Sequence, residues 1–382
     1  MWKKITPFVM LFVLLAATQI CCRKHELTQQ EKYLLEQLNA GNSEEITRLI
    51  EAGTNLNIKN NHGNTPLHIA SIKGDCESIK LLLSKGAKIN STNDNGDTAL
   101  HRAATNGHLE AAKLLIEKGA NVNAKNKQDK TPIYPAAQSG NLDLVKFLVE
   151  KGTYIQTTGY TPLHEPLNNS FLPLQPDNYL AEMIDYFLSK GIDVKTKDEY
   201  LVTPLYLAAI SADGKIIDLL IRKGVKIDAK TKSGQTPLFR ASMAGNKSAA
   251  EVLLDNGADI NMRNDANETP LHFAVRENNM ATFSSMENRI GLIQLLLEHG
   301  ADVNALDRRQ YTPLHYAVAW GWFKHRPSNP PEYKTAHKTI IQILLEKGAD
   351  PNIKDRYKRN ALKLAEGEPE IIELLIKYSA KD

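Results

Sequence analysis

The stretch TPLHIASIKGD, residues 65–75, carries the signals of a short helix with a defined start and stop. Thr65 is a good N-cap, and Pro66 suits the first helical position, where no backbone donor is needed. Gly74 is a typical C-terminal stop because glycine adopts the left-handed conformation at little cost. A second apolar run, SIKLLLSKG, ends in the same way at Gly86. The stretch therefore predicts the first half of a short helical hairpin.

The same phrase recurs along the chain at a nearly fixed spacing. Versions of it begin at residues 65, 98, 131, 161, 203, 236, 269 and 312. Most neighbouring starts are 33 residues apart, one interval is 30, and two others are 42 and 43, which indicates one repeat with a deletion and two insertions. One helix pair cannot bury its own apolar face, whereas stacked pairs bury a continuous one, so the pattern predicts a repeat solenoid.

The repeat GNTPLHIASIKGDCESIKLLLSKGAKIN resembles an ankyrin repeat, with a turn, two antiparallel helices and a linking segment such as GADIN or GANVN. The resemblance covers nearly everything from Thr28 to the C-terminus and gives ten repeats. Two of the ten are divergent and fit capping repeats with a polar outer face. The resemblance implies an all-α repeat solenoid, an ankyrin-type stack of helix-turn-helix units joined by β-turn or hairpin loops.

Length in such an array counts repeats rather than globular domains. We expect one elongated ankyrin-repeat domain over residues 28–382, acting as a monomer. The chain has 47 basic and 44 acidic side chains and a net charge of +3, which gives no general case for nucleic-acid binding. Any electrostatic recognition must therefore be local.

The first residues differ from all that follow. MWKK is positive, ITPFVMLFVLLAATQI is apolar, and CCRKHE returns to polar sequence. The apolar run of about 16 residues is shorter than the roughly 20 that a helix needs to cross a bilayer. This favours a cleaved signal peptide over residues 1–20, followed by a short linker over 21–27, and leaves an uncleaved anchor as the alternative.

Cys21 and Cys22 stand where a bacterial lipoprotein signal places its lipid-accepting cysteine. The resemblance implies a diacylglyceryl group on Cys21, which would hold the protein to a membrane surface. Ordinary cleavage near Ala17 or Thr18 stays open, because TQIC lacks the Leu and the small residue that usually precede such a cysteine.

The histidines follow the repeat rather than a metal site. Five of them occupy the fourth position of the phrase, about one repeat apart, and Tyr134, Tyr206 and Phe239 fill the same position elsewhere without ligand chemistry. We interpret these histidines as hydrogen-bonding groups that brace the turn, and we expect no metal and no cofactor. The five are His68, His101, His164, His272 and His315.

Catalytic motifs are absent from the sequence: there is no HExxH, no GxSxG, no CxxC and no phosphate loop. We therefore expect a protein that is not an enzyme. Three repeats carry extra residues, most simply in the connection between their two helices. These insertions could form a second recognition surface or be plain loop embellishment, and a catalytic site around His325 and His337 is the enzymatic alternative.

Ankyrin-like arrays typically bind proteins through the turn tips and the exposed positions of each first helix. In this sequence those positions lie four, three and one residues before each Thr of the phrase, and seven and eight residues after it. The residues that the resemblance assigns to partner binding are Lys127, Gln128, Glu199, Tyr200, Lys232, Met243, Arg308, Arg309, Tyr311, Trp320, Arg356 and Tyr357.

The C-terminal part of this surface is rich in Arg, Tyr and Trp, in which binding energy tends to concentrate. We hypothesise that it binds an acidic protein segment. The alternative is that Trp320 packs into a helix corner and the arginines are a solvated rim. Three turns lack the glycine of the family pattern and have Leu201, Gln310 and Lys358 instead, so we expect those turns to be remodelled.

The sequence thus predicts a protein–protein interaction module, an adaptor or scaffold, exported to a bacterial envelope and tethered there. Its partner would be another protein that the sequence does not identify. A secreted effector that binds host proteins and a scaffold for a periplasmic enzyme are the competing hypotheses.

Overall fold

The computed structural model describes residues 27–156, 158–168, 179–210, 213–276, 286–319 and 331–378. These residues contain twenty helices in ten consecutive pairs, and no strand. They fall into two compact units. The N-terminal unit comprises the described residues up to 136 together with 146–153, and the C-terminal unit comprises residues 137–145 and the described residues from 154 onward. The predicted all-α ankyrin-type solenoid is confirmed.

The helices of the N-terminal unit are α2 (Gln29–Ala40), α3 (Ser43–Glu51), α4 (Pro66–Lys73), α5 (Cys76–Ser84), α6 (Ala99–Thr105) and α7 (Leu109–Glu117). The boundary between the units passes through α8 (Ile133–Gln138) and α9 (Leu142–Glu150).

The helices of the C-terminal unit are α10 (His164–Asn168), α11 (Tyr179–Ser189), α12 (Pro204–Ala208), α13 (Gly214–Arg222), α14 (Pro237–Ala244), α15 (Lys247–Asp255), α16 (Pro270–Val275), α17 (Met286–Glu298), α18 (Pro313–Ala319), α19 (Pro331–Glu346), α20 (Ala361–Leu364) and α21 (Pro369–Lys377).

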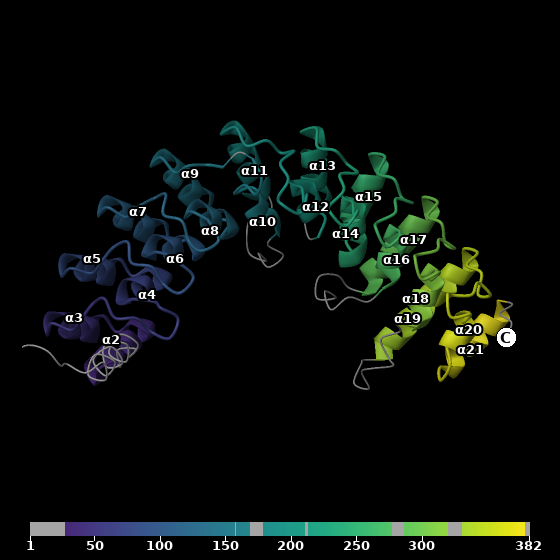
Figure 1. The fold of residues 1–382 in the computed structure, drawn as a ribbon, viewed down its shortest axis with the longest axis horizontal. Coiled ribbons are helices and arrows are strands. Elements are labelled where there is room, and N and C mark those ends of the chain that lie inside the picture. The colour runs from purple at the N-terminus through teal and green to yellow at the C-terminus, as the bar shows by residue number, and fades with distance from the viewer. Residues whose placement is uncertain are drawn as a thin grey trace, which may run out of the picture. The chain divides into compact units, whose positions relative to one another are not determined.

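Within each unit the helices form two layers (Figure 1). In the N-terminal unit, α2, α4 and α6 contact one another in order, and α3, α5 and α7 form the second layer. In the C-terminal unit the even-numbered helices from α10 to α20 form one layer and the odd-numbered helices from α11 to α21 the other. Side chains such as Leu82, Leu100, Phe187 and Leu253 are fully buried between the layers, so each repeat completes its core against its neighbours.

Each first helix begins and ends as the phrase predicts. Thr98 is the N-cap of α6, and its hydroxyl oxygen accepts a hydrogen bond from the backbone N–H of His101. Pro66 and Pro237 stand at the first position of α4 and α14, where their missing N–H leaves no bond unmade. Gly74 ends α4 with a φ of 70°, in the left-handed region.

The phrase histidine connects each repeat to the next. In α4, the backbone N–H of Thr65 donates to His68 Nδ1 at 3.2 Å, so Nδ1 is an acceptor and the ring proton lies on Nε2. Nε2 then donates to the carbonyl oxygen of Asp97 at 2.8 Å, which belongs to the residue directly before Thr98 of the next repeat. The predicted bracing role is confirmed, and it extends to the neighbouring repeat.

The same connection recurs in other repeats. His101 Nε2 lies 3.0 Å from the carbonyl oxygen of Lys130, and His272 Nε2 lies 3.1 Å from that of Tyr311. Where tyrosine replaces the histidine, the Tyr206 hydroxyl donates to Gln235 Oε1 at 2.6 Å. Gln235 again directly precedes the next Thr, so the tyrosine bridges the same two repeats.

The tip of each repeat is a closed five-residue turn directly before the phrase. In the tip at residues 307–311, Asp307 N–H donates to the carbonyl oxygen of Tyr311, and Gln310 N–H donates back to that of Asp307, both at 3.0 Å. The Asp307 carboxylate accepts from the backbone N–H groups of Arg309 and Tyr311 at 2.7 and 2.8 Å. The described tips of this form are residues 60–64, 93–97, 126–130, 198–202, 231–235, 264–268, 307–311 and 355–359.

The expectation that three of these turns are remodelled is wrong. Leu201, Gln310 and Lys358 adopt φ values of 60°, 60° and 61°, close to the 76° of Gly234 in the same position. A left-handed non-glycine residue costs about 1–2 kcal/mol. The closed turn makes two backbone hydrogen bonds and two bonds to its first side chain, which together outweigh that cost.

The three insertions fall between the helices of their repeats, as expected, and part of each extends the second helix. α11, α17 and α19 have 11, 13 and 16 residues, against 9 for α5, α7 and α15. The remaining residues of the insertions, 169–178, 277–285 and 320–330, lie outside the described residues.

None of the helices in the described part of the chain has both the length and the apolar character needed to cross a bilayer.

The buried histidines make stability depend on pH. Burial lowers the pKa of His272 from 6.5 to about 4, against smaller opposing effects of the Tyr311 carbonyl, Asp307 and Glu268. The unfolded chain therefore binds a proton at His272 before the folded chain does, and stability falls as the pH drops from about 6.5 to about 4. This difference corresponds to roughly 3 kcal/mol for one residue.

We predict that His272→Gln weakens this pH dependence. Glutamine at this position can still accept from the Thr269 N–H but does not titrate. Urea unfolding of the variant, followed by circular dichroism near pH 7.5 and pH 4.5, should lose less stability between the two pH values than the wild type does. His62→Gln at an exposed tip position is the control. Equal losses for His272→Gln and the wild type would contradict the assignment.

We also predict that Leu201→Gly stabilises the protein by about 0.5–1 kcal/mol. Glycine removes the strain at φ 60°, and Leu201 is 42% exposed, so little apolar burial is lost. Gly234→Ala tests the same position in the opposite sense, because a Cβ there would lie 2.8 Å from Asp265 Oδ1. Denaturant titration should move the two midpoints in opposite directions, and a lower midpoint for Leu201→Gly would refute the strain argument.

Candidate interaction surface

The tips are joined to one another by backbone hydrogen bonds. In the C-terminal unit, Lys232 N–H donates to the Tyr200 carbonyl at 2.9 Å, and Arg356 N–H donates to the Arg309 carbonyl at 3.1 Å. In the N-terminal unit, Lys127 N–H donates to the Asn95 carbonyl at 3.0 Å. Each bond begins at the second residue of one tip, so successive tips present their side chains in a fixed register.

Most residues predicted to bind a partner are exposed on these tips. This holds for Lys127, Gln128, Glu199, Tyr200, Lys232, Arg308, Arg309, Arg356 and Tyr357. Met243, on α14, is half-buried. Trp320 lies outside the described residues, as do Cys21 and His325.

Tyr311 differs from the prediction because it is only 8% exposed. Its ring stacks on the His315 ring at 5.4 Å and meets the Tyr316 ring edge-on at 5.2 Å. Its hydroxyl accepts a hydrogen bond from Arg359 at 2.5 Å, and burial raises its pKa. Tyr311 therefore supports the last two tips from below rather than offering its ring to a partner.

The reason lies in the position that Tyr311 occupies, the last residue of the tip. Its backbone closes the turn, and its carbonyl accepts the histidine bond from the preceding repeat. The equivalent residues Asp97, Gln235 and Glu268 are also buried or half-buried. This position is therefore part of the contact between repeats and not of the exposed surface.

A partly buried charged network lies beside Tyr311. Glu268 pairs with Arg276 at 2.5 Å, and the Arg276 guanidinium stacks over the Tyr316 ring at 4.1 Å. The Tyr316 hydroxyl donates to Asp307 Oδ2 at 2.7 Å. These contacts join three successive repeats and fix the carboxylate that holds the tip at residues 307–311 in shape.

Asp355 has the same role in the last tip. It accepts hydrogen bonds from the backbone N–H groups of Tyr357 and Arg359 at 2.8 and 2.9 Å, and from Arg359 Nε at 2.9 Å. Desolvation alone would raise the pKa of Asp355, but these bonds to Arg359 and Tyr357 outweigh it and the pKa lies below its ordinary value. The carboxylate is thus charged and fully engaged in the turn.

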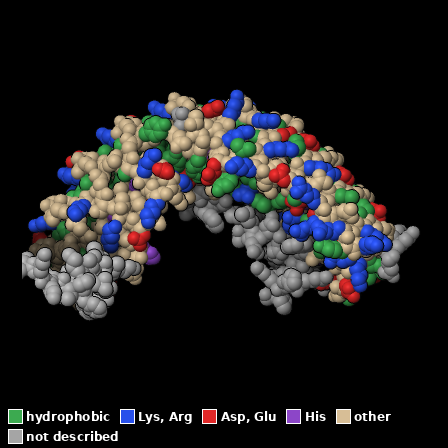
Figure 2. Space-filling view, in the orientation of Figure 1, with side chains coloured by type: hydrophobic (Ala, Val, Ile, Leu, Met, Phe, Trp, Pro, Cys, Tyr) green, Lys and Arg blue, Asp and Glu red, His purple; other side chains and the backbone are tan. Residues whose placement is uncertain are grey.

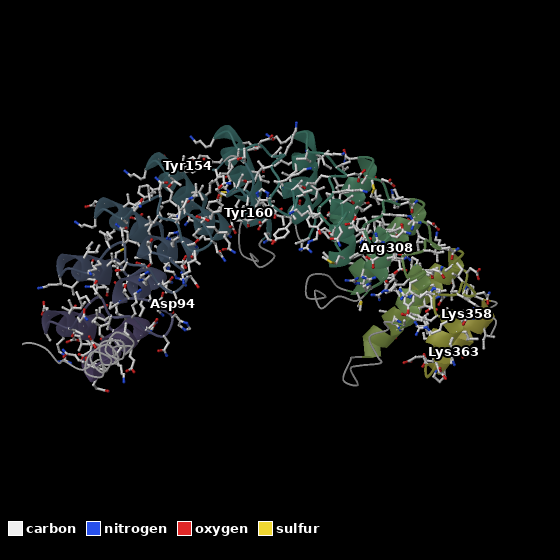
Figure 3. The ribbon with its side chains drawn as sticks, in the orientation of Figure 1. Asp94, Tyr154, Tyr160, Arg308, Lys358 and Lys363 are labelled. Carbon is white, nitrogen blue, oxygen red and sulfur yellow. The ribbon has the colours of Figure 1, made fainter. Side chains whose placement is uncertain are left out.

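Basic side chains gather on the face formed by these two tips. Figure 2 shows Lys and Arg side chains concentrated over the region of α18 and α20, and Figure 3 marks Arg308, Lys358 and Lys363 there. Lys363, on α20, forms an ion pair with Glu366 at 3.2 Å. The sequence analysis named Arg308, Arg309 and Arg356 but did not single out Lys358, which occupies the left-handed position of its tip.

The tips nearer the middle of the chain are less basic. Tyr200 is 60% exposed, and the Lys232 ammonium lies 5.8 Å from the centre of its ring. Glu199 contributes a negative charge beside it. In the N-terminal unit, Asp94 and Asp129 are exposed on their tips, so these surfaces carry charges of both signs.

The described residues show no cluster of three or more His, Cys, Asp or Glu side chains that could hold a metal ion. Burial lowers the pKa of His68, His101, His164 and His315, which keeps these rings neutral near pH 7. His337, near which a catalytic site was considered, has its Nε2 at 2.7 Å from the Ala317 carbonyl. Its described contact is therefore a bond to the end of α18.

Comparisons with known proteins agree with this architecture. A profile of three ankyrin repeats matches residues 33–126, 175–264 and 205–286, which together are more than half of the chain. A profile of many ankyrin repeats matches residues 104–149 and 281–325, and a single-repeat profile matches residues 309–356.

The crystal structure of the human ASB11 ankyrin repeat domain is similar to this chain, with a TM-score of 0.50 and 26% sequence identity. The match covers 63% of this chain and 99% of that domain. No curated protein matches the chain. The repeated phrase, the stacked helix pairs and these matches show that the chain belongs to the ankyrin-repeat family.

Proposed function

We propose that this chain is a non-enzymatic adaptor that binds another protein and is held at a membrane of the bacterial envelope by a lipid on Cys21. Ankyrin repeats support the first part of the proposal, a protein–protein interaction module. Export, tethering and action as a monomer are the finer parts of the proposal, and they are argued from the sequence.

The observation that supports binding is the register of the tips. Backbone bonds between successive tips and histidine bonds beneath them hold exposed side chains in fixed positions. A surface ordered before it meets a partner loses little conformational entropy on binding. The described residues offer no comparable arrangement for catalysis, since the phrase histidines are buried, neutral and bonded to backbone groups.

The observation that supports tethering is the order of segments at the N-terminus. A basic start, an apolar run and a cysteine pair precede Thr28, which caps the first helix of the array. A diacylglyceryl group on Cys21 would leave only residues 22–27 between the membrane and that helix. The adaptor would then present its tips close to the membrane surface.

We predict that Cys21→Ser moves the protein from the membrane to the soluble fraction. Serine cannot form the thioether that carries the lipid. The mature chain would be expressed in a bacterial host, separated into membrane and soluble fractions, and weighed intact. The wild type should begin at Cys21, carry added acyl mass and partition with membranes, and Cys22→Ser is the matched control that should behave like the wild type.

Other results would point to the competing functions. An unmodified chain that begins near Gln19 and is soluble in the periplasm would contradict the tether and leave a free binding protein. Processed chain in the culture medium would favour a secreted effector. A membrane-bound chain that retains residues 1–20 would indicate an uncleaved anchor.

A further inference from the structure

The last two tips, residues 307–311 and 355–359, carry four exposed cations that have no acidic partner. Arg308, Arg309, Arg356 and Lys358 are all exposed, and none of them forms an ion pair with a described residue. Figure 3 shows Arg308 and Lys358 at the surface of the C-terminal unit. The positive charge of these side chains is therefore open to solvent.

The acidic residues of the same two turns do not reach that surface. Asp307 is 6% exposed and Asp355 is 2% exposed. Their oxygens accept bonds from backbone N–H groups, from the Tyr316 hydroxyl and from Arg359. Neither carboxylate has an oxygen directed outward to pair with an exposed arginine.

An exposed aromatic ring lies among these cations. Tyr357 is 61% exposed, with the Arg356 and Arg359 guanidinium groups 5.1 and 5.0 Å from its ring centre. Arg359 is held in place by Asp355 and by the Tyr311 hydroxyl. The ring therefore offers a flat contact surface bordered by positive charge.

The two tips are fixed relative to each other. Arg356 N–H donates to the Arg309 carbonyl at 3.1 Å, and Arg308 N–H is bonded in turn to the Ala266 carbonyl at 3.0 Å. The backbone atoms that carry the arginines are thus positioned before any ligand arrives. Binding would have to order only the side chains.

The geometry points to the binding of an extended acidic segment of a partner protein across these two tips. Its Asp or Glu side chains pair with the arginines of both tips, because guanidinium groups bind carboxylates through two parallel hydrogen bonds. Its backbone lies against the Tyr357 ring. This inference rests on the proposed function, since it names the chemistry of the protein that the adaptor binds.

Protein is favoured over nucleic acid by the rest of the surface. The net charge of the whole chain is only +3, and Asp94, Asp129 and Asp265 are exposed on other tips. A nucleic-acid strand would need a longer continuous positive path for its phosphates. Two neighbouring tips suit a short acidic segment instead.

The test uses the full chain and a short fluorescein-labelled peptide of Asp and Glu residues, with binding followed by fluorescence anisotropy. We expect saturable binding that weakens when NaCl is raised from about 0.05 M to about 0.3 M. The double variant Arg308→Glu/Arg356→Glu should bind at least about tenfold more weakly, because it places like charges opposite the peptide.

The matched control is Lys127→Glu/Lys232→Glu. These lysines occupy the same position of their tips as Arg308 and Arg356, and the change in net charge is identical. The control should bind the peptide within about twofold of the wild type, whereas equal weakening in the two double variants would show a general charge effect and overturn the inference. Thermal unfolding of each variant verifies that it is folded.

Two further outcomes would overturn the site. One is a failure of the wild type to bind the peptide, and the other is tighter binding of a labelled single-stranded oligonucleotide than of the peptide. The adaptor function is judged separately, by crosslinking in cells. A partner retained equally by the wild type and by Arg308→Glu/Arg356→Glu would remove the acidic-segment site while leaving the adaptor intact.

Discussion

A buried imidazole bonded to two repeats at once is the interaction on which the stack depends. One nitrogen of His68 or His272 accepts from the start of its own helix, and the other donates to the carbonyl that directly precedes the next phrase. Because that carbonyl belongs to the last residue of the next tip, the same bond places both the next helix and the next tip. The exposed surface is thus set from within the core.

The chemistry of the first tip residue decides how much charge each turn contains. Asn93 and Asn126 hold their turns with a neutral amide oxygen, whereas Asp307 and Asp355 make the same bonds with a carboxylate. The carboxylates lie beneath the most basic part of the surface. They lower the electrostatic cost of bringing several arginines together without pairing with the exposed ones, which leaves those arginines available.

The repeated phrase carries enough information to predict the helices, their caps and the role of the histidines, because all of these are local or periodic. It does not reveal how one repeat uses the backbone of the next. Tyr311 was assigned to the exposed surface, but its position closes a turn and receives a bond from His272. Leu201 was expected to disturb its turn, yet four hydrogen bonds within the turn hold it at a positive φ.

The imidazole bond spans 29 residues from His68, 39 from His272 and 44 from His315, although its geometry is much the same. Lengthening a connection by this amount adds only a few tenths of a kcal/mol of loop-closure entropy. Contacts that hold the stack together therefore join residues separated by roughly a tenth of the chain length, a low contact order for a protein of this size. Such a chain can nucleate at any well-paired neighbouring repeats and fold outward from them in both directions, as soon as those repeats have left the ribosome.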